Sequence, residues 1–421
     1  MKHLVCLMAL IGLGCLQMRA AEDQEVTLRL IETSDVHGCY FPYDFIGRRP
    51  VKGSLAQVSS FVNEQRKVHG DNLILMDNGD ILQGQPIAYY YNFMDTVSVH
   101  VCADILNFMR YDVGNMGNHD VEAGPSVYNR WVKQCDFPVL GANIIEKATG
   151  RPYLKPYEVI ERDGVKVVVL GMITPAVPSW LPEQLWPGLH FEDMETCAAK
   201  WVRTIRETEH PDVLVGLFHA GPEGNRLDNV VENASADVAQ KVPGFDVVFM
   251  GHVHARHCRK IVNVAGDSVL IVDPANRAGF VSDVTIRVSK KDGKVLRKSV
   301  EGTLTNVRDY PADEAFVRKF QPQYQSTIDF VSRKIGRINQ TISTKDAYFG
   351  PSAFIDLIHQ LQLDISGADI SFCAPLSFNA EIREGDIYMS DMFNLYKYEN
   401  MLYVMQLSGQ EIKDFLEMSY A

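Results

Sequence analysis

Five short polar clusters carry residue types that bind divalent metal ions, and each follows an apolar run typical of a β-strand. The clusters are Asp35-Val36-His37, Gly79-Asp80, Gly117-Asn118-His119-Asp120, His219 and Gly251-His252-Val253-His254. The runs that precede them are Val26–Ile31, Leu73–Met76, Val113, Val213–Phe218 and Val247–Met250. Carboxylate, imidazole and carboxamide groups are donors that suit Zn, Mn, Co or Mg ions. The pattern therefore predicts a metal site at the ends of these strands.

Each cluster taken alone also has an ordinary structural interpretation. Asp35 could be a solvated carboxylate, and Asp80 could be a turn or helix-cap residue. His219 could be a hydrogen-bonded histidine of the core. Two histidines on alternate positions, as in His252 and His254, rarely serve packing alone. Because one site explains all five clusters, whereas packing needs five separate explanations, the metal interpretation is favoured.

The chemistry that such a set predicts is metal-assisted hydrolysis of a phosphoester. Hydrolysis is slow because the anionic centre repels the nucleophile. Two cations about 4 Å apart can deprotonate a water and neutralise the charge that develops. A histidine beside the ligands, such as His119, can stabilise charge or protonate the leaving group.

The elements that must position these clusters alternate between strands and helices. Helical periodicity is present in Ser54–Lys67 and Thr196–Thr208, and strands without polar clusters are predicted at Lys166–Gly171 and Ser268–Val272. This alternation predicts an α/β layered fold with helices covering the sheet faces. Ligands of such folds gather beyond the carboxyl ends of the strands, so we expect the clusters to meet in one cleft.

The length of 421 residues exceeds what one hydrophobic core usually holds. We expect a signal peptide over 1–21, a catalytic domain over 25–310, a connecting helix over 311–334 and a second α/β domain over 335–421. The second domain is expected to be truncated, because its sequence stops within the helical pattern Gly409–Tyr420.

The order D-x-H, G-D, G-N-H-[DE], H and G-H-x-H resembles the calcineurin-like metallophosphoesterases, from Val26 to about Val288. This resemblance implies a four-layer β-sandwich flanked by helices and a two-metal centre. One metal would be held by Asp35, His37, Asp80 and His254, and the other by Asp80, Asn118, His219 and His252, with Asp80 bridging. The reaction would be in-line attack of a metal-bridging hydroxide on phosphorus. His119 would be the catalytic histidine, oriented by Glu122 or Asp120, with Glu122 favoured.

The whole chain resembles the exported 5′-nucleotidases, a group that includes 2′,3′-cyclic-nucleotide phosphodiesterases and UDP-sugar hydrolases. The parallel segments in the second domain are Ala368–Phe372, Gly385–Ile387, Tyr398–Leu402 and Leu407–Gly409. Where the family carries N-G-G-G-I-R, this chain reads Ala374-Pro375-Leu376-Ser377-Phe378-Asn379, so the family's phosphate-binding arginine is missing. Arg383 is a candidate replacement for it, with a solvated surface arginine as the favoured interpretation. Asn118 and His119 are the other candidate substrate contacts. The family's base-stacking aromatic pair would lie beyond Ala421.

The resemblance implies a small nucleotide substrate, with nucleoside 5′-monophosphates first. Cyclic nucleotides, sugar nucleotides and non-nucleotide phosphates stay open, as does a metal- or nucleotide-binding protein with little turnover. The net charge of -12 and the absence of a basic cluster argue against binding duplex nucleic acid. A small anion remains compatible, because bound cations can reverse the local field.

The N-terminus predicts export to the periplasm or the cell surface. Lys2 precedes the apolar run Leu4–Leu16, and small residues follow at Ala20 and Ala21. The run is too short to span a bilayer and has the flanks of a cleaved signal. Cys15 is a candidate lipid anchor. No other segment is apolar enough for a transmembrane helix, and the oligomeric state is left open.

Overall fold

The computed structural model describes residues 24–227, 230–348, 350–374, 379–396 and 401–420. The predicted signal peptide and Cys15 lie outside these residues. Among the residues described, no helix combines the length and apolar character needed to cross a membrane.

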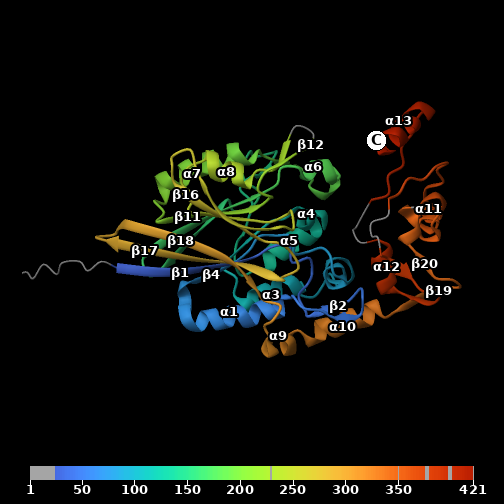
Figure 1. Ribbon diagram of the computed structural model, residues 1–421, viewed down its shortest axis with the longest axis horizontal. Coiled ribbons are helices and arrows are strands. Elements are labelled where there is room, and N and C mark those ends of the chain that lie inside the picture. Colours follow the sequence, from blue (N-terminus) through green and yellow to red (C-terminus); the bar gives the residue numbers. More distant parts are fainter. Residues whose placement is uncertain (1–23, 228–229, 349, 375–378, 397–400, 421) are drawn as a thin grey trace, which may run out of the picture.

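Two six-stranded sheets form the centre of the larger part of the molecule (Figure 1). The first has the order β18–β17–β1–β4–β5–β6. Its strands are β1 (Gln24–Thr33), β4 (Leu73–Asp77), β5 (Val113–Asn115), β6 (Val139–Leu140), β17 (Phe280–Lys291) and β18 (Lys294–Asn306). The second has the order β15–β16–β14–β11–β9–β8. Its strands are β8 (Tyr157–Arg162), β9 (Val165–Ile173), β11 (Val213–His219), β14 (Val247–Met250), β15 (Arg256–Val262) and β16 (Ser268–Pro274).

The central strands of each sheet run parallel, and this brings their carboxyl ends to one edge. In the first sheet β1, β4, β5 and β6 are parallel neighbours. In the second sheet β9, β11, β14 and β16 are parallel neighbours. Strands such as β4 and β11 are apolar over nearly their whole length and buried throughout, as expected of strands covered on both faces.

Helices cover the outer face of each sheet, which makes four layers. The first sheet is covered by α1 (Leu55–His69), α3 (Val101–Met109) and α5 (Pro125–Gln134), and the second by α7 (Met194–Thr208) and α8 (Ser235–Lys241) (Figure 1). A third buried cluster, with Leu28 and Val169 among its members, fills the space between the sheets. The predicted metallophosphoesterase fold, a β-sandwich flanked by helices, is confirmed.

The connecting helix predicted over 311–334 is divided into two helices, α9 (Glu314–Lys319) and α10 (Gln321–Val331). The break lies at Phe320, whose φ of -97° and ψ of 11° leave the helical region. Pro322 has no amide hydrogen to donate to the carbonyl of Arg318, so a continuous helix would lose that bond. In the first turn of α10 the missing hydrogen costs nothing.

The second part of the chain is small and follows α10 (Figure 1). It contains β19 (Lys334–Ile338), β20 (Ile342–Ser343), α11 (Ala353–Ser366), β21 (Glu381–Ile382), β22 (Gly385–Tyr388), α12 (Met389–Leu395) and α13 (Gly409–Tyr420). Among the residues described in this part, six form a buried cluster: Ile342, Phe354, Ile358, Ala380, Ile382 and Leu395. Arg48 of the sandwich joins the two parts, because its Nε donates to Ser390 Oγ at 2.8 Å and its guanidinium lies 4.2 Å from the centre of the Tyr388 ring.

Candidate metal centre

The five predicted clusters meet at one pocket, which lies at the carboxyl ends of β1, β4, β5, β11 and β14. The pocket has a volume of about 450 Å³. Its lining includes His37, Asn118, His119, Glu122, His252 and His254. Asp35, Asp80 and His219 lie deeper, with at most 1% of their surface exposed.

The loops after β1 and β4 are held together by backbone hydrogen bonds. The Asp35 amide donates to the Gly79 carbonyl and the His37 amide to the Asp80 carbonyl, both at 3.0 Å. Five candidate ligands have a positive φ: Asp35 (51°), His37 (50°), Asp80 (55°), His252 (76°) and His254 (55°). This conformation is uncommon outside glycine and is found preferentially where function requires it. The gathering of five such residues at neighbouring strand ends agrees with a functional site at this place.

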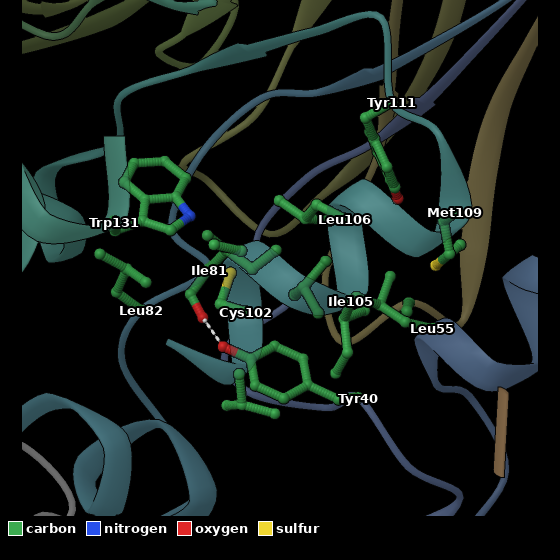
Figure 2. Close-up of a cluster of buried hydrophobic side chains, with 14 of the residues drawn as sticks. Tyr40, Leu55, Ile81, Leu82, Cys102, Ile105, Leu106, Met109, Tyr111 and Trp131 are labelled. Carbon is green, nitrogen blue, oxygen red and sulfur yellow. Dashed lines mark hydrogen bonds between the residues drawn. The ribbon is translucent and has the colours of Figure 1, made fainter. Parts of the chain in front are cut away.

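Buried side chains hold the turn that carries Asp80 in place through hydrogen bonds. The Asp120 carboxylate accepts the amide hydrogens of Asp80 (2.8 Å), Ile81 (2.9 Å) and Leu82 (2.9 Å). The Tyr40 hydroxyl donates to the Ile81 carbonyl at 2.8 Å inside a buried apolar cluster (Figure 2). The Asp120 side chain is therefore committed to backbone donors of this turn.

One cluster of candidate ligands contains Asp35, His37 and His254. Nε2 of His254 lies 3.2 Å from Asp35 Oδ1 and 2.9 Å from Nε2 of His37. Nδ1 of His37 faces the backbone carbonyl and the side-chain oxygen of Gln83, both at 3.1 Å. Burial lowers the pKa of His37 to about 4, even though two carboxylates lie near it.

A second cluster contains Asp80, His219 and His252. Nε2 of His219 lies 3.1 Å from Asp80 Oδ2 and 3.1 Å from Asn118 Oδ1, and its Nδ1 faces the Asn78 carbonyl at 2.7 Å. Burial opposes protonation of His219, but the nearby carboxylates outweigh it and raise its pKa to about 10. Without a metal, a proton would thus occupy the space between this imidazole and Asp80.

The donor atoms of both clusters fit divalent cations. A neutral imidazole has one N–H and one lone pair. In His37 and His219, Nδ1 faces carbonyl oxygens, which assigns the hydrogen to Nδ1 and the lone pair to Nε2. These Nε2 lone pairs face acceptor oxygens or another Nε2 at about 3 Å. Two lone pairs at this distance repel each other, so a cation or a proton is needed between the atoms.

His119 lies beside both clusters and contacts Glu122. Its Nδ1 is within hydrogen-bond distance of Glu122 Oε2, and its amide donates to Asp80 Oδ1 at 2.8 Å. Burial opposes the His119 charge, but Asp80 and Glu122 raise its pKa to about 9. Of the two acidic residues considered from the sequence, Glu122 is the one in contact with the imidazole.

Glu232, Trp180 and Arg277 belong to the site but were not predicted from the sequence. Glu232 Oε1 lies 2.8 Å from Nε2 of His252. Trp180 and Arg277 line the pocket, and the Trp180 ring lies 5.5 Å from that of His252. No local motif surrounds any of the three. Arg383, predicted to contact substrate, instead donates to Glu381 Oε1 at 2.7 Å and does not line the pocket.

Comparison with known protein families shows which family the chain belongs to. The family described as calcineurin-like phosphoesterase matches residues 28–256, which is more than half of the chain. The chain belongs to this family. The family described as 5′-nucleotidase, C-terminal domain, matches residues 334–421 of the phosphoesterase. The predicted enzyme class, a phosphoric ester hydrolase, is confirmed at the level of the family.

Individual relatives are distant. The trifunctional nucleotide phosphoesterase YfkN of Bacillus subtilis is 26% identical over 94% of this chain and 30% of its own length. The 2′,3′-cyclic-nucleotide 2′-phosphodiesterase/3′-nucleotidase of Haemophilus influenzae is 26% identical over 95% of this chain and 68% of its own. A 5′-nucleotidase precursor from Thermus thermophilus, 22% identical, superposes with a TM-score of 0.68 over 93% of this chain and 78% of its own, which shows the shared fold. The phosphoesterase thus spans under a third of the first relative and about two thirds of the second.

Proposed function

We propose that this phosphoesterase hydrolyses phosphoesters of nucleotides, with nucleoside 5′-monophosphates as the leading substrate class. The observation that carries the proposal is the convergence of two ligand clusters and the His119–Glu122 pair on one pocket. The nucleotide part is supported by the names of the relatives and by the match of residues 334–421 to a nucleotidase domain.

The residues would hold two divalent cations. Asp35, His37 and His254 would form one site, and Asn118, His219 and His252 the other, with Asp80 between them. When bound, such cations supply an activated water as nucleophile and neutralise charge on the phosphoryl group. The nitrogen and oxygen set accepts Zn, Mn, Co or Mg.

His119 would supply the proton that the leaving oxygen requires. Glu122 engages Nδ1 and so fixes the ring orientation, while the bond from the His119 amide to Asp80 fixes the backbone. The Glu122 carboxylate raises the pKa of His119 and so favours the protonated imidazole that a general acid requires. Glu122 thereby acts through His119.

Trp180 provides an aromatic surface on the wall of the pocket. It is 39% exposed and forms the end of α6 (Val177–Trp180). Stacking of a nucleobase on an aromatic ring contributes about 1–3 kcal/mol. The β-sandwich therefore offers a stacking surface of its own for the base.

A second candidate function is hydrolysis of 2′,3′-cyclic nucleotides. It is favoured by the name of the Haemophilus relative and by Asn379, which stands where the 5′-nucleotidase pattern has a phosphate-binding arginine. Sugar nucleotides remain a further alternative. Export to the periplasm or the cell surface is proposed from the N-terminal pattern alone, and N-terminal sequencing of the mature protein tests it.

The test is a substrate panel on protein that has been stripped of metal and reloaded with Mn²⁺, Zn²⁺ or Co²⁺. The substrates are AMP, 2′,3′-cyclic AMP, UDP-glucose and a simple aryl phosphate. Metal-dependent hydrolysis of AMP that is lost in His119→Ala supports the leading proposal, and the exposed His190→Ala is the matched control. Hydrolysis of the cyclic substrate alone selects the second candidate. Turnover of the aryl phosphate alone refutes the nucleotide assignment.

A further inference from the structure

The pocket contains one permanent positive charge. Among the described residues that line it, Arg277 is the single lysine or arginine. We infer that the Arg277 guanidinium binds the phosphate group of the substrate, a contact that the sandwich domain itself provides. The inference rests on the proposed function, because it names a binding contact for the anion that this function requires.

The loop that carries Arg277 is strained although it contains none of the candidate metal ligands. It follows β16, and three of its non-glycine residues have a positive φ: Ala275 (65°), Arg277 (58°) and Ala278 (47°). Such strain persists only where the surroundings enforce it. Here the Arg277 amide donates to the Asp35 carbonyl at 2.8 Å, which ties the loop to the first ligand cluster.

The Arg277 side chain is available for a ligand. It is exposed, and within the described residues no carboxylate lies at ion-pair distance and no hydrogen bond reaches its guanidinium. It lines the pocket together with Cys39 and Asn276. Arg383, by contrast, is already bonded to Glu381.

A guanidinium at this place complements the rest of the site. Its planar fork can donate two parallel hydrogen bonds to phosphate oxygens. The nearby acidic groups, such as Glu122, would otherwise repel the part of the phosphate that no cation neutralises. Arg277 would therefore take the role of the arginine that is missing at Asn379, although it belongs to the β-sandwich and Asn379 to the second part of the chain.

The experiment compares Arg277→Gln and Arg277→Lys with Arg203→Gln, which alters an exposed arginine of α7 that does not line the pocket. The Mn²⁺-loaded proteins are assayed on AMP and an aryl phosphate, with inorganic phosphate as competitive inhibitor. A lost charge-assisted contact predicts a rise of about 10- to 100-fold in KM and in the phosphate inhibition constant for Arg277→Gln, with kcat within about threefold. Arg277→Lys should recover part of the loss, and the bound metal should be unchanged.

A change of less than about twofold in both constants, relative to Arg203→Gln, would overturn the inference. So would loss of metal in Arg277→Gln, because the effect would then act through the Asp35 cluster. If the unaltered protein turns over none of the substrates, the proposed function fails. Calorimetric titration of the metal-loaded chain with inorganic phosphate still tests Arg277 in that case, and equal binding by all the variants would refute its role.

Discussion

Replacement of Glu232 tests whether a residue outside the ligand set controls one of the two proposed metal sites. Glu232 lies on β13 (Val230–Asn233), and its Oε1 is 2.8 Å from Nε2 of His252, with 11% of each side chain exposed. The Thr174 hydroxyl donates to the Glu232 carbonyl at 2.9 Å and fixes the strand. When Nε2–H of His252 donates to Glu232, the lone pair on Nδ1 is the one left for a metal.

The expected loss of metal affinity follows from the single hydrogen bond between Glu232 and His252. Loss of a carboxylate that orients a metal-bound histidine typically weakens metal binding about 10- to 100-fold, which corresponds to about 1.4–2.7 kcal/mol. Solvent screens little of this interaction energy, because the Glu232 residue as a whole is only 8% exposed. We expect Glu232→Ala to show the full loss. Glu232→Gln keeps an acceptor for Nε2–H but no charge, so its loss should be smaller.

The assay is equilibrium binding of Zn²⁺ or Mn²⁺ from metal buffers, with the metal content of the protein as readout. His252 belongs to the cluster with Asp80 and His219, so one site should weaken while the site of Asp35, His37 and His254 stays unchanged. The matched control is Glu223→Ala, which removes an exposed glutamate 3.6 Å from Arg259. Unchanged affinity at both sites, or an equal loss at both, would refute the reasoning.

Three further predictions address stability, the shape of the site and the substrate. Burial, with a smaller contribution from Arg130, lowers the pKa of His100 to about 3. Below pH 6.5 the unfolded chain therefore binds a proton that the folded chain rejects, so the free energy of unfolding should fall by up to about 1.4 kcal/mol per pH unit down to pH about 3. In His100→Asn the denaturant-derived stability should depend less steeply on pH over this range; an unchanged slope contradicts the assignment. A Cβ on Gly117 would overlap the backbone nitrogen and Oδ1 of Asp80, so Gly117→Ala should lose metal and activity, whereas Gly409→Ala, whose Cβ would meet nothing within 4 Å, should retain both. Trp180→Ala should raise KM for AMP about 5- to 150-fold but leave KM for glycerol phosphate nearly unchanged; equal effects on both substrates would exclude base stacking.

The clusters of candidate ligands could be predicted because each is local in sequence. An apolar run followed by Asp35-Val36-His37 or by His252-Val253-His254 predicts both where the strand ends and which metal-binding groups lie there. Parallel pairing of β1 with β4 and of β11 with β14 then brings the strand ends together, as the general rule for open α/β sheets predicts. The strand Val247–Met250 has the predicted bounds, and others extend by a few residues because pairing continues beyond the apolar run.

The connecting segment shows where local periodicity misleads. Apolar residues at helical spacing continue from Phe316 through Phe320 to Ile328, and this suggested one helix. Both phenylalanines are fully buried against the helices of the first sheet, so burial is satisfied although Pro322 breaks the backbone hydrogen bonds. Spacing reports which side chains are buried; it does not report whether the backbone between them is continuous.

The sequence by itself determined the α/β class and the candidate ligand residues, because these depend on strand-end motifs a few residues long. Only the tertiary structure decided which groups act around the ligands. Glu122 rather than Asp120 contacts His119, because the Asp120 carboxylate is engaged by three amides of the Asp80 turn. Glu232 and Arg277 reach the site from a hairpin and from a strained loop that are distant in sequence from their neighbours in the pocket. Such contacts follow from the packing of two sheets, which no short segment of sequence encodes.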